Sequence, residues 1–325
     1  MRYRRLGGSG LWVSALTVGS AMATGPVDYR SGAATDPGDA PERFVKGVQR
    51  AIDAGITTFD TASAYGAGRA EELLGQAIAG HRRDGLVLIT KVFFPTGPTP
   101  NERGLSRKHI FASLHGSLRR LDTDHVDVYL AHRFDDQTPL AETMSAFADL
   151  VHAGKAHYIG VSGWTAAQLS AAAEFDLPLV CNQEIYHLLD RTVENEMAPR
   201  CAELGVSLMA CAPLAGGLLT GKYRADAPAP TGTRGAGAGA GRLAAPLADA
   251  DLLTRIGKLA PLAAAAGLTM PALAVAWALS RPSVAAAVIG LTQADQLDDL
   301  LPAAETDLDE SLTEAVDDVL SIPTQ

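Results

Sequence analysis

The sequence predicts a (β/α)8 barrel, in which eight parallel strands alternate with helices around a closed core. Short β-rich runs alternate with helical patterns along the chain, and several of these runs end in polar residues. At 325 residues, the chain is long enough for one large barrel, so we expect residues 1–325 to form a single domain. A doubly wound sheet is the structural alternative. The turn after its first strand normally reads G-x-G-x-x-G, and Gly19-Ser20-Ala21-Met22 does not.

The predicted elements begin with an N-terminal β-hairpin over residues 2–14, which has a Gly-rich turn at residues 7–10. Barrel strands are then expected at 15–19, 57–61, 86–92, 126–131, 157–162, 179–183, 206–211 and 285–290. Helices that end at Gly55, Gly154 and Gly205 are expected at 42–54, 139–153 and 194–204, and Ser106 begins another.

Two long connections interrupt this rhythm, at residues 24–40 and 225–246. Both are rich in small residues and lie on connections from a strand to the next helix, so we expect them to be lids over the catalytic end of the barrel. For residues 225–246, with their run of alternating Gly and Ala, a tolerated insertion is an equally good interpretation.

The composition narrows the classes of partner. A formal charge of −10 disfavours binding to nucleic acid or to an anionic membrane. No run is long enough to span a membrane, and the basic N-terminus lacks the apolar segment of a secretory signal. Cys181, Cys201 and Cys211 are odd in number and lack metal-type spacing, which is typical of free thiols in a reducing compartment. We therefore expect a cytoplasmic protein without membrane insertion.

Four polar residues stand at or just past the ends of three successive predicted strands: Asp60, Tyr65, Lys91 and His132. In a parallel barrel these ends meet at one rim, where barrel enzymes keep their chemistry. An acid, a phenol, an ammonium and an imidazole at one point indicate a proton-transfer site. A metal site built on His132 and Asp60 lacks a second histidine at suitable spacing, so no metal is expected.

The segment Asp60-Thr61-Ala62-Ser63-Ala64-Tyr65-Gly66 resembles the D-T-A-x-x-Y-G motif of the aldo-keto reductases. Further motifs of that family are matched in order along the chain, at residues 71–75, 104–110, 117–121, 154–162 and 212–223. The chain is most similar to bacterial members related to the potassium-channel β-subunits. This resemblance implies reduction of a carbonyl to an alcohol by direct hydride transfer from a nicotinamide cofactor.

The resemblance also implies roles for the four residues. Tyr65 is the general acid that protonates the carbonyl oxygen, and His132 positions that oxygen by a hydrogen bond. Lys91 is expected to lower the pKa of the phenol, while Asp60 holds Lys91 charged and oriented.

The same resemblance assigns cofactor-binding residues in three groups. They are Ser162, Gly163, Asn182, Gln183 and Cys211 at the nicotinamide; Pro213, Leu214, Gly216, Gly217, Leu218, Lys222 and Arg234 at the phosphates; and Gly290, Thr292, Gln296 and Asp299 at the adenosine. NADPH (NADP+) is expected rather than NADH, because hydroxyl, amide or cationic donors such as Thr292, Gln296 and Arg234 suit a 2′-phosphate.

Two positions depart from the family pattern. Gly163 stands where the family has Asn or Arg, and Cys211 stands where an aromatic ring stacks on the nicotinamide. Either Trp12, Trp164 or Tyr186 takes over that stacking, or the cofactor is held more loosely.

The substrate and the biological role stay open at this point. A small aldehyde, a sugar and a keto-deoxysugar nucleotide all fit a small-molecule carbonyl substrate, and either a monomer or a homo-oligomer is compatible with the chain. The alternative function is an NADP-binding, redox-sensing regulatory subunit with little turnover. A metal-free hydrolase or lyase is a third interpretation, which would need no nicotinamide contacts.

Overall fold

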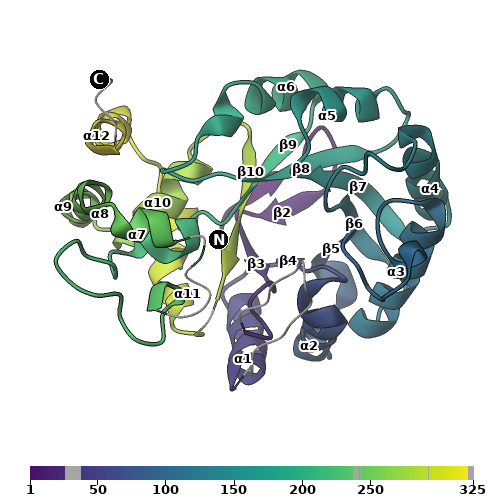
Figure 1. Cartoon of the computed structure of the whole chain (residues 1–325), viewed down its shortest axis with the longest axis horizontal. Helices are drawn as coiled ribbons and strands as arrows, with labels where there is room; N and C mark the ends of the chain where they lie inside the picture. The colour runs from purple at the N-terminus through teal and green to yellow at the C-terminus, as the bar shows by residue number, and fades with distance from the viewer. Residues whose placement is uncertain (26–37, 237–240, 242, 292, 321–325) are drawn as a thin grey trace.

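The computed structural model describes residues 1–25, 38–236, 241, 243–291 and 293–320. Its barrel strands are β3 (Leu16–Gly19), β4 (Thr58–Asp60), β5 (Val87–Val92), β6 (Val126–Ala131), β7 (Ala156–Ser162), β8 (Leu179–Ile185), β9 (Ser207–Cys211) and β10 (Val284–Gly290). They form a closed barrel in the order β10-β3-β4-β5-β6-β7-β8-β9, and each neighbouring pair is parallel (Figure 1). The predicted (β/α)8 fold is confirmed, and each predicted strand overlaps an observed one.

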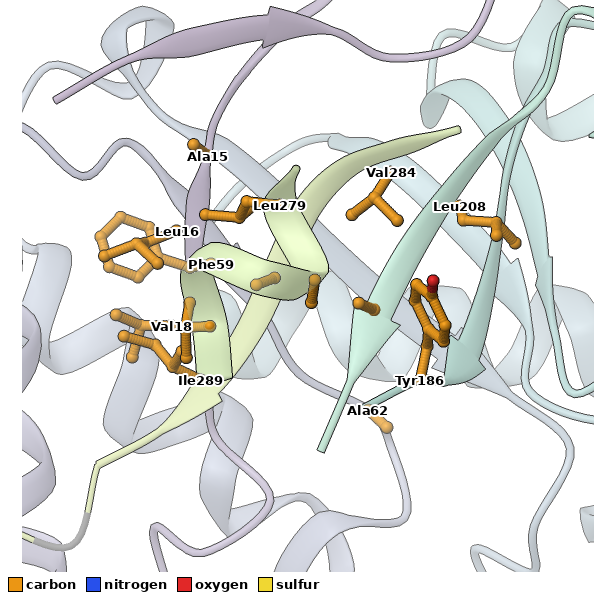
Figure 2. Close-up of a cluster of buried hydrophobic side chains, with 14 of the residues drawn as sticks. Ala15, Leu16, Val18, Phe59, Ala62, Tyr186, Leu208, Leu279, Val284 and Ile289 are labelled. Carbon is orange, nitrogen blue, oxygen red and sulfur yellow. The ribbon is translucent and has the colours of Figure 1, made fainter. Parts of the chain in front are cut away.

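Side chains alternate along each strand between the barrel interior and the surrounding helices. Ile89, Val128 and Met209 fill the interior, whereas Phe59 and Leu208 belong to a larger outer cluster. Figure 2 shows part of this outer layer around β3, β4, β9 and β10. The alternation matters for the site, because it decides which polar residues at the strand ends face inward.

A two-stranded hairpin closes the amino end of the barrel, as predicted. Strands β1 (Tyr3–Arg5) and β2 (Trp12–Ser14) pair antiparallel. Leu6 and Val13 are fully buried in the same cluster as the inward-facing strand residues. Gly7 adopts φ +60°, and a Cβ there would lie 2.6 Å from the carbonyl oxygen of Val180, so the turn needs glycine. With this end plugged, the open end lies at the carboxyl ends of the strands.

Helices surround the barrel: α1 (Ala40–Asp53), α2 (Arg69–Ile78), α3 (Arg107–Leu121), α4 (Leu140–His152), α5 (Ala166–Ala173), α6 (Met197–Leu204), α7 (Ala244–Ala248), α8 (Ala250–Gly257), α9 (Leu259–Ala265), α10 (Met270–Leu279), α11 (Gln296–Leu300) and α12 (Glu310–Leu320). The three helices predicted to end at glycine do so, and all three glycines have positive φ. Ser106 caps α3 by accepting a hydrogen bond from the backbone N–H of His109. Helix α6 begins at Met197 rather than at residue 194, because Thr192–Glu194 forms a separate 3-10 turn.

The two predicted lids are only partly described: residues 26–37, 237–240 and 242 lie outside the described residues. Most of the described residues between 225 and 246 are exposed, and two of them are anchored to the rest of the structure. The backbone N–H of Gly235 donates to the Tyr223 hydroxyl at 3.0 Å, and Leu243 is buried. Residues 244–246 already belong to α7.

No single helix in the described part of the chain is long and apolar enough to cross a membrane. One pair, Ala250–Ala265 and Met270–Leu279, passes that test only when joined, and its two halves meet at 85°.

Candidate functional site

Asp60, Lys91 and Tyr65 meet at the carboxyl end of the barrel. The Lys91 ammonium donates to Asp60 Oδ1 at 2.5 Å, to the carbonyl oxygen of Thr61 at 2.9 Å and to the Tyr65 hydroxyl at 3.4 Å. Lys91 is fully buried and the Asp60 side chain is only 3% exposed. Three acceptors thus satisfy the three ammonium protons, and the phenol is one of them.

A tight turn brings Tyr65 back over the strand ends. Tyr65 begins the 3-10 segment η1 (Tyr65–Gly68), in which Gly66, Ala67 and Gly68 all have positive φ. A Cβ on Gly66 would approach Thr24 Oγ1 to 2.6 Å, and one on Gly68 would meet the Arg120 side chain. Glycine is therefore required at both positions if the phenol is to reach Lys91.

A buried carboxylate ties this turn to the neighbouring elements. Glu71 in α2 is fully buried, accepts a hydrogen bond from Thr90 at 2.6 Å and pairs with Arg120 of α3 at 2.7 Å. Thr90 directly precedes Lys91 on β5, so this network links the helix after Tyr65 to the strand that carries Lys91.

His132 follows β6 and completes the four-residue cluster. Its ring lies edge-on to Tyr65, with centroids 5.7 Å apart, and edge-on to Phe94 at 4.9 Å. Burial and the positive charges of Lys91 and Arg133 hold the pKa of His132 well below its ordinary value. The imidazole is therefore neutral and offers one N–H to a bound oxygen.

The phenol is also held in its protonated form. Burial and the Asp60 carboxylate raise the pKa of Tyr65 well above its ordinary value, whereas Arg133 lowers it. This direction is opposite to the one expected from Lys91, because burial disfavours the phenolate and Asp60 at 2.5 Å balances the charge of Lys91. A neutral phenol beside a neutral imidazole is an arrangement that can donate hydrogen bonds to a carbonyl oxygen.

The residues predicted at the nicotinamide fall into two groups. Gln183 reaches across the barrel and donates to Asp60 Oδ2 at 2.8 Å, and Ser162 and Cys211 end β7 and β9. Asn182 does not join them. Its side-chain amide donates at 2.9 Å to Glu184 and also contacts Met197 of α6 in the outer layer. Because side chains alternate along β8, Asn182 and Glu184 lie on the face of the strand opposite to Gln183.

Gly163 lies under the side chain of Arg133, a residue that the sequence analysis did not single out. Gly163 has φ +65°, and a Cβ there would lie 2.9 Å from Arg133 Nη1. That guanidinium donates to the carbonyl oxygen of His132 at 2.7 Å and to Ser162 Oγ at 3.3 Å. A cation from the neighbouring loop thus lies where the resemblance leads us to expect a longer side chain at Gly163. The available signal was the position of Arg133, directly after His132.

Neither Trp12 nor Tyr186 is placed to stack above Cys211. Trp12 belongs to the hairpin at the opposite end of the barrel and is 53% exposed. The Tyr186 ring lies 5.3 Å from Trp277, and its hydroxyl donates to Glu194 at 2.5 Å, both in the outer layer. Trp164 is buried and packs edge-on against Phe134 at 4.9 Å. Burial raises the pKa of the Cys211 thiol to about 12, so this position carries a neutral thiol.

The residues predicted at the phosphates surround one left-handed turn. Pro213 and Leu214 lead from β9 into the 3-10 segment η5 (Ala215–Thr220), which contains Leu218. Gly216 and Gly217 have φ of 69° and 103°.

Two cations lie over these glycines. A Cβ on Gly217 would come within 2.9 Å of Lys222 Nζ, and one on Gly216 within 3.4 Å of Arg234 Nη1. Backbone flanked by two cations is a chemically suitable cradle for a pyrophosphate.

The predicted adenosine residues follow β10. Gly290 is the last residue of that strand, and Gln296 and Asp299 lie in α11. The backbone carbonyl of Asp299 accepts a hydrogen bond from Thr269, and Gln296 Oε1 accepts one from the backbone of Gln293. Thr292 lies outside the described residues.

One cluster in the described residues has metal-ligand chemistry, and it lies at the other end of the barrel. His125, Asp127 and His157 stand at the starts of β6 and β7, with potential ligand atoms within 4.8 Å of one another. Asp127 already pairs with Arg83 at 2.7 Å, and the two imidazole rings stack at 4.4 Å. The cluster is separate from the four residues around Tyr65.

Comparison with known proteins agrees with this geometry. The family model described as "Aldo/keto reductase family" matches residues 22–321. A probable voltage-gated potassium channel subunit beta of Arabidopsis thaliana is 38% identical over 314 residues, covering 94% of this chain and 92% of that protein. A protein of the same description from Oryza sativa subsp. japonica is 39% identical over 308 residues, covering 91% and 89%.

A solved structure points the same way. A thermostable aldo-keto reductase, crystallised with the inhibitor epalrestat, superposes with a TM-score of 0.78 at 31% identity, covering 98% of this chain and 100% of that one. Family match, relatives and fold agree over nearly the whole length. The chain belongs to the aldo/keto reductase family, an oxidoreductase family built on the (β/α)8 barrel.

Proposed function

We propose that the chain is a cytoplasmic enzyme of one domain that reduces a small-molecule carbonyl to an alcohol with NADPH. The observation that carries this proposal is the Tyr65 hydroxyl, protonated, buried and 3.4 Å from an ammonium that is itself paired with Asp60. A phenol so placed can give a proton to a carbonyl oxygen, and Lys91 stabilises the phenolate that is left.

The residues present fit a nicotinamide dinucleotide. Gln183 uses its amide N–H on Asp60, which leaves Oε1 to accept from the carboxamide, and Ser162 adds a hydroxyl. Lys222 and Arg234 would hold the pyrophosphate above the Gly216–Gly217 turn. The preference for NADPH over NADH rests on the donors expected at the 2′-phosphate, Gln296 among them. When bound, the cofactor supplies the hydride.

The chain's own residues would then act on the carbonyl oxygen. His132 donates its N–H and fixes the direction of the carbonyl, while Tyr65 transfers its proton as negative charge develops on that oxygen. Solvent returns the proton to Tyr65 after the alcohol leaves. No metal takes part in this scheme.

Tyr65→Phe tests the proposal. We expect kcat for carbonyl reduction to fall by about 10²–10⁴-fold, with the Kd for NADPH nearly unchanged, because the proton is needed only in the transition state. Nicotinamide absorbance reports turnover, and tryptophan fluorescence quenching reports binding of NADPH and NADH.

Tyr3→Phe is the matched control, since it removes a hydroxyl bonded to Gly55 at the opposite end of the barrel. Wild-type kcat in Tyr65→Phe, or no binding of either cofactor to the wild type, contradicts the proposal.

A second candidate function comes from the relatives. Both plant proteins are described as probable channel β-subunits, which favours an NADP-binding regulatory subunit that senses redox state. Tight NADPH binding without turnover of any carbonyl in a broad panel would support this alternative.

A further inference from the structure

Arg133 holds a guanidinium over the carboxyl end of β7, beside the proposed site. Its Nη1 donates to two uncharged acceptors, the carbonyl oxygen of His132 at 2.7 Å and Ser162 Oγ at 3.3 Å. The residue is exposed to solvent at the rim. The position of this cation is therefore fixed by neutral contacts, and the residue is accessible to a ligand from solvent.

Among the residues that the structure describes, the charge of Arg133 has no ion-pair partner. Among the described residues, no carboxylate lies within ion-pair distance of it, and its Nε and Nη2 donate no hydrogen bond to them. Arg120, by contrast, pairs with Glu71 at 2.7 Å. Arginine offers five N–H donors in a planar fork, so several donors of Arg133 stay available to a ligand.

The field of Arg133 reaches the reacting groups. Its charge lowers the pKa of Tyr65, of Cys211 and of His132, although burial is the larger influence on each. It also acts on Glu184, whose pKa is raised to about 7 by burial, so this neighbouring carboxyl is largely protonated below neutral pH. The guanidinium is therefore close enough to the phenol and the imidazole to act on both electrostatically.

Gly163 makes this placement possible. A Cβ at that position would approach Arg133 Nη1 to 2.9 Å and Cζ to 3.3 Å, so any larger residue would push the guanidinium away. On the other side, Arg133 lies 5.9 Å from the Phe94 ring, which in turn packs on His132. Backbone, hydroxyl and aromatic ring together hold the cation in place.

We propose that Arg133 binds an oxyanion carried by the substrate, so that this chain prefers carbonyl compounds with a carboxylate or phosphate group over neutral ones. The inference rests on the proposed reductase function and names the substrate class for the same site. A carboxylate or phosphate accepts two N–H donors of a guanidinium at once, which orients the rest of the molecule. With the anion on Arg133, the carbonyl is directed toward His132 and Tyr65.

A positioning role toward Ser162 is the competing explanation for Arg133. In that case its loss would weaken cofactor binding and slow every substrate equally. The two explanations therefore differ in the selectivity between matched anionic and neutral substrates, and that ratio is independent of general damage to the enzyme.

Two matched pairs of aldehydes measure this ratio at saturating NADPH. 4-Oxobutanoate against butanal tests a carboxylate, and glycolaldehyde phosphate against glycolaldehyde tests a phosphate. In the wild type we expect kcat/KM to favour the anionic member of at least one pair by about 10- to 100-fold, chiefly through KM, as for a charge-assisted hydrogen bond. The pair that shows the preference identifies the kind of anion.

Arg133→Gln should reduce the ratio to within about threefold of unity, and Arg133→Lys should keep part of it. Arg200→Gln is the matched control. It removes the same charge from the outer helix α6, where Arg200 pairs with Glu203, and should leave the ratio as in the wild type. Should Arg133→Gln not fold, succinate or inorganic phosphate should still compete with butanal in the wild-type protein.

If the wild type reduces butanal and glycolaldehyde as efficiently as their anionic partners, this inference is overturned and the reductase function stays intact. An anion preference that persists in Arg133→Gln also overturns it. If no aldehyde is reduced and NADPH does not bind, the proposed function fails, and the inference falls with it.

Discussion

Separating Asp60 from Lys91 should destabilise the barrel more than almost any other single change. Lys91 is fully buried and donates three hydrogen bonds, while Asp60 accepts from Lys91 on one oxygen and from Gln183 on the other. Every polar atom of the pair is satisfied inside the barrel. Asp60→Asn leaves a buried ammonium without its counter-ion, and Lys91→Met leaves a buried carboxylate. We expect each to lower the free energy of unfolding by about 3–5 kcal/mol.

The double variant should behave differently, because it removes both charges together. Methionine fills much of the volume of lysine, and asparagine can still accept from Gln183. We expect Asp60→Asn/Lys91→Met to lower the free energy of unfolding by no more than about 2 kcal/mol, far less than the sum of the single variants.

Urea unfolding followed by far-UV circular dichroism measures all four proteins. The exposed pair Arg200–Glu203 on α6, with N···O 2.7 Å, is the control cycle, and its coupling should stay below about 1 kcal/mol. Additive effects within about 0.5 kcal/mol for Asp60 and Lys91 would refute the reasoning, since charges in contact inside a barrel cannot act independently.

Two further predictions concern the rim. Cys211→Trp should tighten NADPH binding several-fold, because a ring there adds about 1 kcal/mol of stacking on the nicotinamide; unchanged or weaker binding in a fluorescence titration speaks against a gap above Cys211. Burial raises the pKa of Glu184 in the folded state to about 7, above its unfolded value near 4.5. The stability that the protonated carboxyl contributes is therefore fully present below pH 4.5 and is lost as the pH rises through 7. Glu184→Gln should therefore match the wild type in stability near pH 4 and exceed it by about 1–3 kcal/mol at pH 8; equal unfolding free energies at both pH values would contradict this.

The barrel and the four-residue cluster were predictable because both follow from local patterns. Apolar runs with polar ends mark the strands, and parallel strands in a closed barrel must end at one rim, which brings Asp60, Lys91 and His132 together. The outward position of Asn182 could also have been derived, since Gln183 faces inward and side chains alternate along a strand.

Other features depend on packing between segments far apart in the chain. Nothing at Gly163 alone indicates that Arg133 from another loop will lie over it. The direction of the Tyr65 pKa was missed for a similar reason, because burial and the pairing of Lys91 with Asp60 outweigh simple proximity to an ammonium. The anchoring of Gly235 could not be predicted either, because its partner, the Tyr223 hydroxyl, lies 12 residues away in the chain.

Closure of the barrel also determines how its parts can open to solvent. A ring of paired strands has no free edge, so backbone amides in β4 and β5 should exchange with deuterium only when the whole ring unfolds. Tyr65 is outside that ring, on a left-handed turn that can detach without breaking a strand pair. We therefore expect the backbone amides of η1 to exchange faster than those of β4 and β5, while the Asp60–Lys91 pair beneath stays protected for as long as the barrel stays folded.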